Sequence, residues 1–367
     1  MKVRIYAGSS RIVEKSGVGQ AIHHQEEMLR RMGAAVTKKN ERDADIVHIN
    51  TVFPDSALAA VRAKRRGQFV ICYGHSTMED FRNSFRFSNR LAPLFLKWIR
   101  FLYSRGDLII TPTEYSRKLL ESYGIRKPIV ALSNGVDTDF FRPQPESRRL
   151  FRKRYGLREE DRVVVTAGHF IERKGILEFI KLARKLPDVR FFWFGTTSPK
   201  LITREVHEAM ENKPENLEFP GFVSQAELRD AYCGSDLFCF MSREETEGIV
   251  VLEALASGVP VLVRDIPVYD GWLEHGKNVW KADSEDEFLR LTKGVLSGSL
   301  PDLTGAGRET AEARSLETIG EDLLSIYQKA EQAKARQDDA AESGEEELAW
   351  MDPAESSPLV EQRGSAV

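Results

Sequence analysis

This chain contains two series in which short apolar runs alternate with longer stretches of helical pattern. This alternation limits the possible folds more than any other feature of the sequence. Strands that alternate with helices form parallel sheets with helices on both faces. The pattern therefore predicts an α/β protein with two doubly wound domains in tandem. The predicted strands are residues 3–7, 45–49, 69–73, 108–112 and 129–132 in the first series, and 162–168, 189–195, 237–240 and 259–263 in the second. The clearest predicted helices lie at about 20–32, 57–66 and 318–330.

The chain length of 367 residues suits two such domains. Residues 142–161 contain two prolines and many charges, and we place the link between the domains there. The predicted organisation is an N-terminal domain over 1–150, a C-terminal domain over 151–310, a helix over 311–330 and an acidic tail over 331–367. The tail has 3 basic against 10 acidic residues and is expected to be disordered. Ligands of doubly wound sheets bind at the carboxyl ends of the strands, so a cleft between the domains is the expected site.

The composition excludes several classes of protein. No run of about 18 apolar residues occurs, so no segment is expected to span a membrane. The N-terminus has the pattern of a strand and lacks the apolar core of a signal peptide. The three cysteines, Cys72, Cys233 and Cys239, lack metal-ligand spacing and are expected to be structural thiols in a reducing cytoplasm. Nucleic acid is not an expected partner, because no reader motif occurs and the pI is near 6.2.

The stretch from Glu245 to Glu253 carries the strongest chemical signal. The two carboxylates stand eight positions apart, with Gly248 between them and an apolar helix-to-strand passage after them. Gly248 is expected to open a helix whose first N–H groups can hold an anion. Glu253 would then lie on that helix, with Glu245 on the loop before it. This layout is able to hold a phosphate and to bind hydroxyl groups on either side of it, which is what a sugar nucleotide requires.

The same stretch resembles the Glu-x7-Glu signature of retaining glycosyltransferases of family 4, which have the two-domain GT-B fold. Other matching pieces occur in the expected order and together cover residues 1 to about 330. No single piece is specific, but five in order are hard to obtain by chance. The other four are Ser16-Gly17-Val18-Gly19, His75, Ser133-Asn134-Gly135-Val136-Asp137, and Gly168 with Arg173-Lys174-Gly175.

The resemblance assigns roles to the matching residues. Lys174 and Arg173 would offset the charge that builds on the departing diphosphate. Glu245 would accept hydrogen bonds from a hexose hydroxyl and Glu253 from the ribose, while His75 would lie beside the donor hexose and the reaction centre. The catalytic set is therefore His75, Glu245 and Lys174, without a protein nucleophile. The remaining donor-binding residues that the resemblance implies are Gly17, Gly19, Asn134, Gly248, and Ile249 and Val250 through their backbone N–H groups.

The chain departs from the family pattern at two positions. Gly168-His169 stands where the family usually has Gly-Arg, which puts one diphosphate-binding cation in doubt, and Arg173 is the expected substitute. Glu247 stands where the family usually has an aromatic residue. Two interpretations of Glu247 remain open, namely a second contact with the sugar and an exposed side chain without such a role. Glu245 and Glu253 also match a pair of glycosidase carboxylates, but a carboxylate inside an apolar helix suits nucleotide binding better.

Residues 82–105 interleave basic residues with aromatic and leucine side chains and contain no acid. Their apolar members at helical spacing are Leu91, Leu94, Phe95, Trp98 and Leu102. Part of this stripe is expected in the core, and the basic face is expected on anionic lipid, each charge contributing about 1 kcal/mol. A solvated face over a core helix is the alternative. The residues predicted on the membrane and acceptor side are Arg82, Arg86, Arg90, Trp98 and Arg100.

The stretch 74–81, together with the residues that follow it, resembles bacterial enzymes that glycosylate diacylglycerol or glucosyl-diacylglycerol. The expected function is transfer of a hexose from a UDP-sugar to a glycolipid acceptor, by a cytoplasmic protein peripheral on the inner face of the plasma membrane. No cofactor is expected, and a divalent metal would at most stimulate. Glucose and galactose remain open as the donor sugar. The alternatives are a soluble acceptor such as a cell-wall or capsule saccharide and a non-catalytic sugar-nucleotide-binding protein, while the Glu245–Glu253 spacing disfavours an epimerase.

Overall fold

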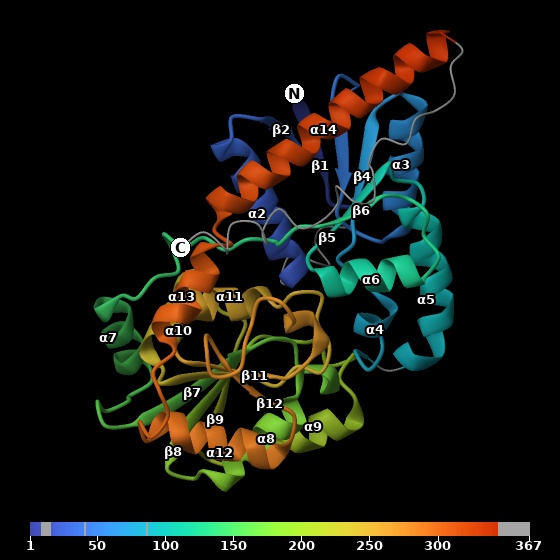
Figure 1. Cartoon of the computed structure of the whole chain (residues 1–367). Coiled ribbons are helices and arrows are strands. Elements are labelled where there is room, and N and C mark those ends of the chain that lie inside the picture. Colours follow the sequence, from blue (N-terminus) through green and yellow to red (C-terminus); the bar gives the residue numbers. More distant parts are fainter. Residues whose placement is uncertain (9–15, 40–41, 86, 344–367) are drawn as a thin grey trace. The chain divides into compact units, whose positions relative to one another are not determined.

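The computed structural model describes residues 1–8, 16–39, 42–85 and 87–343. It divides the chain into two compact units, each containing one parallel sheet (Figure 1). The first unit comprises Met1–Thr77, Pro93–Gly135 and the chain from Leu316 onward, and the second comprises Met78–Ala92 and Val136–Ser315. The α/β class predicted from the alternating pattern is confirmed.

The sheet of the first unit has the strand order β2-β1-β3-β4-β5-β6, and every pairing is parallel. Its central strands are buried on both faces, which explains their continuous apolar runs. The strands are β1 (Lys2–Tyr6), β2 (Ala35–Thr37), β3 (Ile46–Ile49), β4 (Phe69–Tyr73), β5 (Leu108–Thr111) and β6 (Ile129–Ala131). The helices are α2 (Gly17–Arg31), α3 (Pro54–Arg65), α6 (Glu114–Ser122) and α14 (Leu316–Ser343), with α5 (Ser88–Tyr103) divided between the units.

The sheet of the second unit has the order β12-β11-β10-β7-β8-β9, again parallel throughout. The strands are β7 (Arg162–Ala167), β8 (Val189–Phe194), β9 (Leu217–Gly221), β10 (Leu237–Phe240), β11 (Val261–Arg264) and β12 (Trp280–Ala282). The helices are α4 (Met78–Phe81), α7 (Pro145–Arg154), η1 (Glu172–Lys174), α8 (Ile176–Lys185), α9 (Arg204–Glu211), α10 (Gln225–Gly234), α11 (Ile249–Ala256), η2 (Pro267–Tyr269), α12 (Glu285–Leu296) and α13 (Thr304–Glu312).

The observed division differs from the predicted boundary at residue 150. The predicted link 142–161 contains α7, which packs against α10 and lies within the second unit. The segment Met78–Ala92 also groups with that unit, although the chain enters it directly from the first. Prolines and charged residues indicate a link between domains only where they are not part of a helix. Here Pro145 is the first residue of a helix, a position that favours proline.

The end of the chain also differs from the prediction. The helix expected at 318–330 begins at Leu316 and continues to Ser343, so the first part of the predicted disordered tail is helical. The rest of that tail lies outside the described residues. Helix α14 lies beside α2 in the first unit (Figure 1). Its buried residues join the core of the first sheet and are Leu316, Ile319, Leu323, Ile326, Tyr327 and Ala330.

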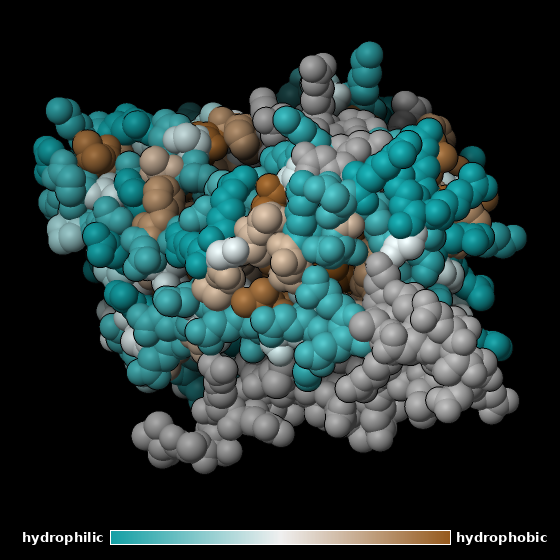
Figure 2. Space-filling model, turned by 90° about the horizontal axis from the view of Figure 1, so that it is seen from above, coloured by the Kyte–Doolittle hydropathy of each residue, from teal (hydrophilic) through white to brown (hydrophobic). Residues whose placement is uncertain are grey.

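The sequence did not predict three strands, β2, β9 and β12, each of which lies at an edge of its sheet. β2 and β12 have only three residues each. β9 includes Pro220 and Gly221, which weaken a strand signal and are tolerated at an edge. On the face drawn in Figure 2, hydrophilic side chains predominate and hydrophobic ones show only in small groups. No helix among the described residues is long and apolar enough to cross a bilayer.

Candidate functional site

Two loops of the second unit bring Lys174 and Glu245 together. Because β7 and β10 are parallel neighbours, the loops that follow them leave the sheet at the same edge. Gly175 ends the first loop with φ = +81°, and a Cβ there would lie 2.4 Å from the Met241 carbonyl. Only glycine permits this close passage. The Lys174 ammonium consequently lies 2.5 Å from the Glu245 carboxylate, with both side chains largely buried.

The charges of this pair are mutually dependent. Burial by itself would raise the pKa of Glu245, but the positive charges of Lys174 and Arg173 outweigh it and hold the pKa below its ordinary value. Burial lowers the pKa of Lys174, and Glu245 partly opposes that effect. The pair therefore places a desolvated cation and an ionised carboxylate at one point of the sheet edge.

Helix α11 begins where the anion-holding turn was predicted. Gly248 is its N-cap residue with φ = +95°, and no side chain caps the helix. Ile249 and Val250 are its first two residues, and N–H groups in the first turn have no partner within a helix. The position of Glu245 before this helix and of Glu253 within it is confirmed. Glu247 is buried rather than exposed.

Glu253 has a different environment from Glu245. Its carboxylate is buried and accepts a hydrogen bond of 3.0 Å from the hydroxyl of Tyr232 on α10. No cation contributes to its pKa, so burial raises that pKa to about 8. The second carboxylate of the signature is therefore largely protonated at neutral pH in this structure.

The structure adds one residue that the sequence analysis missed. Tyr269, at the end of η2, is fully buried, and its hydroxyl has no hydrogen-bond partner within the described chain. A Cβ placed on Gly248 would lie 3.3 Å from that hydroxyl. Burial and then the charge of Glu245 raise the Tyr269 pKa. A tyrosine that follows a strand does not by itself indicate a functional site in a sequence. Tyr269 is a candidate site residue only because the fold places it near Glu245 and Gly248.

Arg173 directly precedes Lys174 in the same loop, but its side chain does not pair with Glu245 as that of Lys174 does. It contacts different groups. The guanidinium is buried and contacts Asp80 and the Glu244 carbonyl. The Nδ1 atom of His169 lies 2.6 Å from the Thr196 carbonyl oxygen, and burial lowers the pKa of this imidazole. The substitution of Arg173 for the missing cation therefore stays a prediction.

His75 lies at the carboxyl edge of the first sheet, within the first unit. Its imidazole stacks on Tyr73 at 4.0 Å between ring centroids, and its Nε2 is 3.3 Å from the Asn50 side-chain oxygen. Tyr73 stacks in turn on His48, which contacts the hydroxyl of Tyr327 on α14. Burial lowers the pKa of His75 to about 3, with a further contribution from His48. His75 is thus a neutral hydrogen-bonding group at physiological pH.

The other residues predicted in the first unit lie near the same edge. Gly17 and Gly19 belong to the first turn of α2 and not to a loop, because Ser16 caps the helix by accepting from the Gly19 N–H. Asn134 follows β6 and is buried, and its carbonyl lies 3.2 Å from the Nδ1 of His24 on α2. The predicted donor-binding residues therefore form one group in each unit.

The predicted membrane side lies mostly on α5. Arg82, Arg90 and Arg100 are exposed, while Arg86 lies outside the described residues. Trp98 is half-buried, and its indole N–H donates to the Val52 carbonyl at 2.6 Å. Part of the apolar stripe is in the core, as expected, because Leu102 is buried, whereas Leu91 and Leu94 are 46% and 66% exposed. The residues of this helix that are buried are Ser88, Ala92, Ile99, Leu102 and Tyr103.

Within the described chain, no group of three or more histidine, cysteine, aspartate or glutamate side chains is arranged to hold a metal ion.

The two families whose models match this chain are "Glycosyltransferase Family 4", over residues 16–140, and "Glycosyl transferases group 1", over residues 147–302. Each match covers most of one predicted domain.

Two curated relatives and one solved structure extend the comparison. The processive diacylglycerol alpha-glucosyltransferase of Acholeplasma laidlawii is 41% identical over 89% of this chain and 98% of its own length. The alpha-galactosylglucosyldiacylglycerol synthase of Streptococcus pneumoniae is 29% identical over 89% of this chain and 88% of its own length. The crystal structure of Anabaena HepE in complex with UDP and glucose matches with a TM-score of 0.74 at 15% identity, covering 89% of this chain and 99% of that one.

The two parallel Rossmann-like sheets and this structural neighbour define a GT-B fold, so the predicted fold is confirmed. The chain belongs to the same family of glycosyltransferases as the Acholeplasma enzyme. The prediction that it is an enzyme of the glycosyltransferase class is therefore confirmed.

Proposed function

We propose that this chain is a retaining, family 4 hexosyltransferase that uses a UDP-sugar to glycosylate a lipid acceptor such as glucosyl-diacylglycerol. The observation that carries the proposal is the 41% identity, over 89% of the chain, with a processive diacylglycerol glucosyltransferase. A second relative, similar over the same share of the chain, is named for the product galactosylglucosyldiacylglycerol. Both names describe enzymes that form a glycolipid from a hexose and a diacylglycerol lipid.

The second unit is the proposed donor side. Lys174 lies beside the N-terminus of α11 through its contact with Glu245, so an ammonium and helix N–H groups are available to a diphosphate. Glu245, ionised, accepts from a hexose hydroxyl, and Glu253 accepts from the ribose. Proton transfer from the acceptor goes to the leaving phosphate, so no protein nucleophile takes part. The donor binds without an obligatory metal.

The first unit is the proposed acceptor side, with His75 as a neutral hydrogen-bonding group near the reaction centre. The exposed face of α5 is the proposed membrane contact, which makes the protein peripheral on the inner face of the membrane. Its apolar side chains include Leu91, Leu94 and Phe101, each at least 43% exposed. Arg90, Lys97 and Arg100 are exposed on the same helix and provide the cations that anionic lipids attract.

The test is transfer from labelled UDP-glucose and UDP-galactose to vesicles containing diacylglycerol or glucosyl-diacylglycerol, with and without EDTA. A glycolipid product from one donor supports the proposal and also identifies the sugar. Products only on soluble saccharides, or donor binding without any transfer, would contradict it.

The same assay tests the donor site. We expect Lys174→Gln to lower kcat by about 100-fold or more, because a preorganised group that stabilises transition-state charge is typically worth that much. Lys181→Gln is the matched control, since Lys181 is an exposed lysine paired with Glu285 on α12. Equal activity of the two variants would refute the assignment of Lys174.

A further inference from the structure

The side chain of Arg173 is engaged by a segment from much earlier in the chain. Its Nη1 lies 2.9 Å from the Asp80 carboxylate, and its Nε donates to the Ser84 hydroxyl at 3.0 Å. The same Nη1 also donates to the Glu244 carbonyl at 2.5 Å. Arg173 is only 7% exposed and the Asp80 side chain is 29% exposed, so the guanidinium end of these charge-assisted contacts is shielded from bulk water.

The segment that Arg173 contacts also has hydrogen bonds of its own. The Ser84 hydroxyl donates to the Asp80 carbonyl at 2.6 Å while it accepts from the arginine. Asn83 and Asn89 hydrogen-bond to each other through two contacts, of 3.0 and 2.8 Å. Asn83 and Phe87 have φ of +53° and +70°, a region that a bulky phenylalanine adopts only where its surroundings impose it.

Arg173 is also fixed through its backbone to the loop that precedes α11. Its carbonyl accepts from the Arg243 N–H at 2.8 Å, and the Ser242 hydroxyl lies within hydrogen-bonding distance of the same oxygen. The arginine therefore joins three pieces of the second unit, namely η1, the β10–α11 loop and the segment 78–92. The first two of these carry Lys174 and Glu245.

We propose that Arg173, Asp80 and Ser84 form a latch that fixes the segment 78–92, with its exposed arginines, to the donor-binding unit. Arg173 is then a positioning residue for this segment of the second unit, which carries Arg82 and Arg90 of the predicted membrane and acceptor side, and not a ligand of the diphosphate. The Asp80 carboxylate balances the charge of Arg173, and the Nε and Nη1 atoms of Arg173 already donate to three acceptors. Lys174 differs from Arg173 in this respect, because its partner Glu245 is itself a residue of the proposed donor site. This inference rests on the proposed function for its assignment of donor and acceptor sides.

Hydrogen exchange of the full-length protein tests the latch without reference to activity. We expect Asp80→Asn and Ser84→Ala to speed exchange of peptides within 78–92 by about tenfold or more, because the contacts that oppose local opening are lost. Arg82→Gln, which changes an exposed side chain of the same segment, is the control and should leave exchange unchanged. Combining Asp80→Asn with Arg173→Gln should add little to either variant alone. Unchanged exchange in Asp80→Asn, or fully additive effects, would overturn the proposal.

Steady-state kinetics then separates the latch from a diphosphate ligand. For Asp80→Asn we expect the apparent KM of the lipid acceptor to rise about five- to tenfold, with the donor KM within about twofold of wild type, and Asp80→Glu to recover part of the loss. A changed donor KM with an unchanged acceptor KM would assign Arg173 to the diphosphate instead. If the wild-type protein transfers nothing to lipid, the proposed function fails, while the exchange experiment still decides the latch.

Discussion

At the scale of single residues, the two carboxylates of one sequence signature lie in opposite electrostatic environments. Glu245 faces a buried ammonium and stays ionised, whereas Glu253 faces only a tyrosine hydroxyl and its pKa rises to about 8. The sequence places Glu245 on a loop and Glu253 on a helix, but it does not indicate the charge of either side chain. The neighbours that distinguish them come from η1 and α10, far away along the chain.

The raised pKa of Glu253 predicts a pH-dependent stability. The unfolded chain loses this proton near pH 4.5 and the folded chain near pH 8, so the free energy of unfolding falls as pH rises between these values. Glu253→Gln mimics the protonated form, and we expect its Tm to exceed that of wild type at pH 8 by more than at pH 5. Thermal unfolding from pH 5 to 9 measures this difference. Glu245→Gln is the control of opposite sign, since it should lower Tm at pH 8, and a pH-independent difference for Glu253→Gln would contradict the prediction.

Gly175 is the residue on which the Lys174 loop depends. We expect Gly175→Ala to reduce the free energy of unfolding by roughly 3 kcal/mol or more, because positive φ is unfavourable for alanine and its Cβ would strike the Met241 carbonyl. Gly298→Ala is a matched control with φ = +69° and no atom within 4 Å of the added Cβ. It should cost only about 1–2 kcal/mol. Urea unfolding of both variants checks the difference, and equal losses would show that the contact with Met241 is unimportant.

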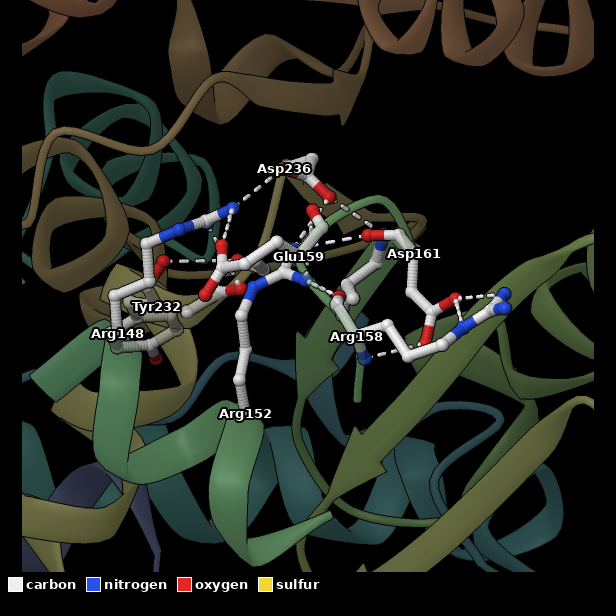
Figure 3. A network of polar contacts seen from close by, with 10 residues as sticks. Arg148, Arg152, Arg158, Glu159, Asp161, Tyr232 and Asp236 are labelled. Carbon is white, nitrogen blue, oxygen red and sulfur yellow. Dashed lines mark hydrogen bonds and ion pairs between the residues drawn. The ribbon is translucent and has the colours of Figure 1, made fainter. Parts of the chain in front are cut away.

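At the scale of elements, a polar network fastens α7 to the starts of β7 and β10 (Figure 3). The guanidinium of Arg152 is almost fully buried and donates to the carbonyls of Arg158 and Asp161 and to the Asp236 carboxylate. Asp236 also accepts from the Val163 N–H at 2.8 Å. These groups lie at the amino ends of the strands, opposite the edge that carries the candidate site, so their role is structural.

Removing the arginine of this network should destabilise the second unit strongly. We expect Arg152→Ala to cost about 3–5 kcal/mol, because it removes the buried cation that Asp236 faces and takes a donor from the carbonyls of Arg158 and Asp161. Arg158→Ala is the control, since Arg158 is 72% exposed and its ion pairs should be worth less than about 1 kcal/mol. Chemical denaturation measures both. A loss below about 1 kcal/mol for Arg152→Ala would mean that the network does not hold α7.

At the scale of the whole molecule, the first unit is completed by the end of the chain. Six buried residues of α14 belong to the core that covers the first sheet, together with side chains of α2. Each buried aliphatic or aromatic side chain contributes about 1.5–3 kcal/mol, so together they are comparable with the 5–15 kcal/mol that stabilises a typical protein. The first sheet therefore depends on residues some 200 positions after its last strand.

Truncation tests this dependence. We expect a chain ending at Ser315 to lose the cooperative unfolding transition of its first unit, because that truncation exposes the core beneath α14. A chain ending at Ser343 is the control and should keep the wild-type Tm. Circular dichroism during thermal unfolding distinguishes them. A first unit that unfolds cooperatively without α14 would show that its core is sufficient by itself.

Most of the fold class and part of the site were predictable from the sequence. The apolar runs identified nine strands because buried parallel strands need apolar side chains on both faces. The Gly248 turn was predictable because a glycine followed by apolar residues is local information. The three edge strands β2, β9 and β12, the helix within 142–161 and the buried Tyr269 were not predictable, since each depends on contacts with distant residues.

The amino-acid sequence alone thus determined the α/β class, the two parallel sheets and the order of the candidate site residues along the chain, because strand periodicity and turn chemistry are encoded over a few neighbouring positions. Which groups meet was decided only on folding. The Lys174–Glu245 pair, the protonated state of Glu253, the engagement of Arg173 by Asp80 and the return of α14 to the first sheet all join residues at least 20 positions apart. Charge, burial and pKa depend on such neighbours, so they follow from three-dimensional packing and not from spacing along the chain.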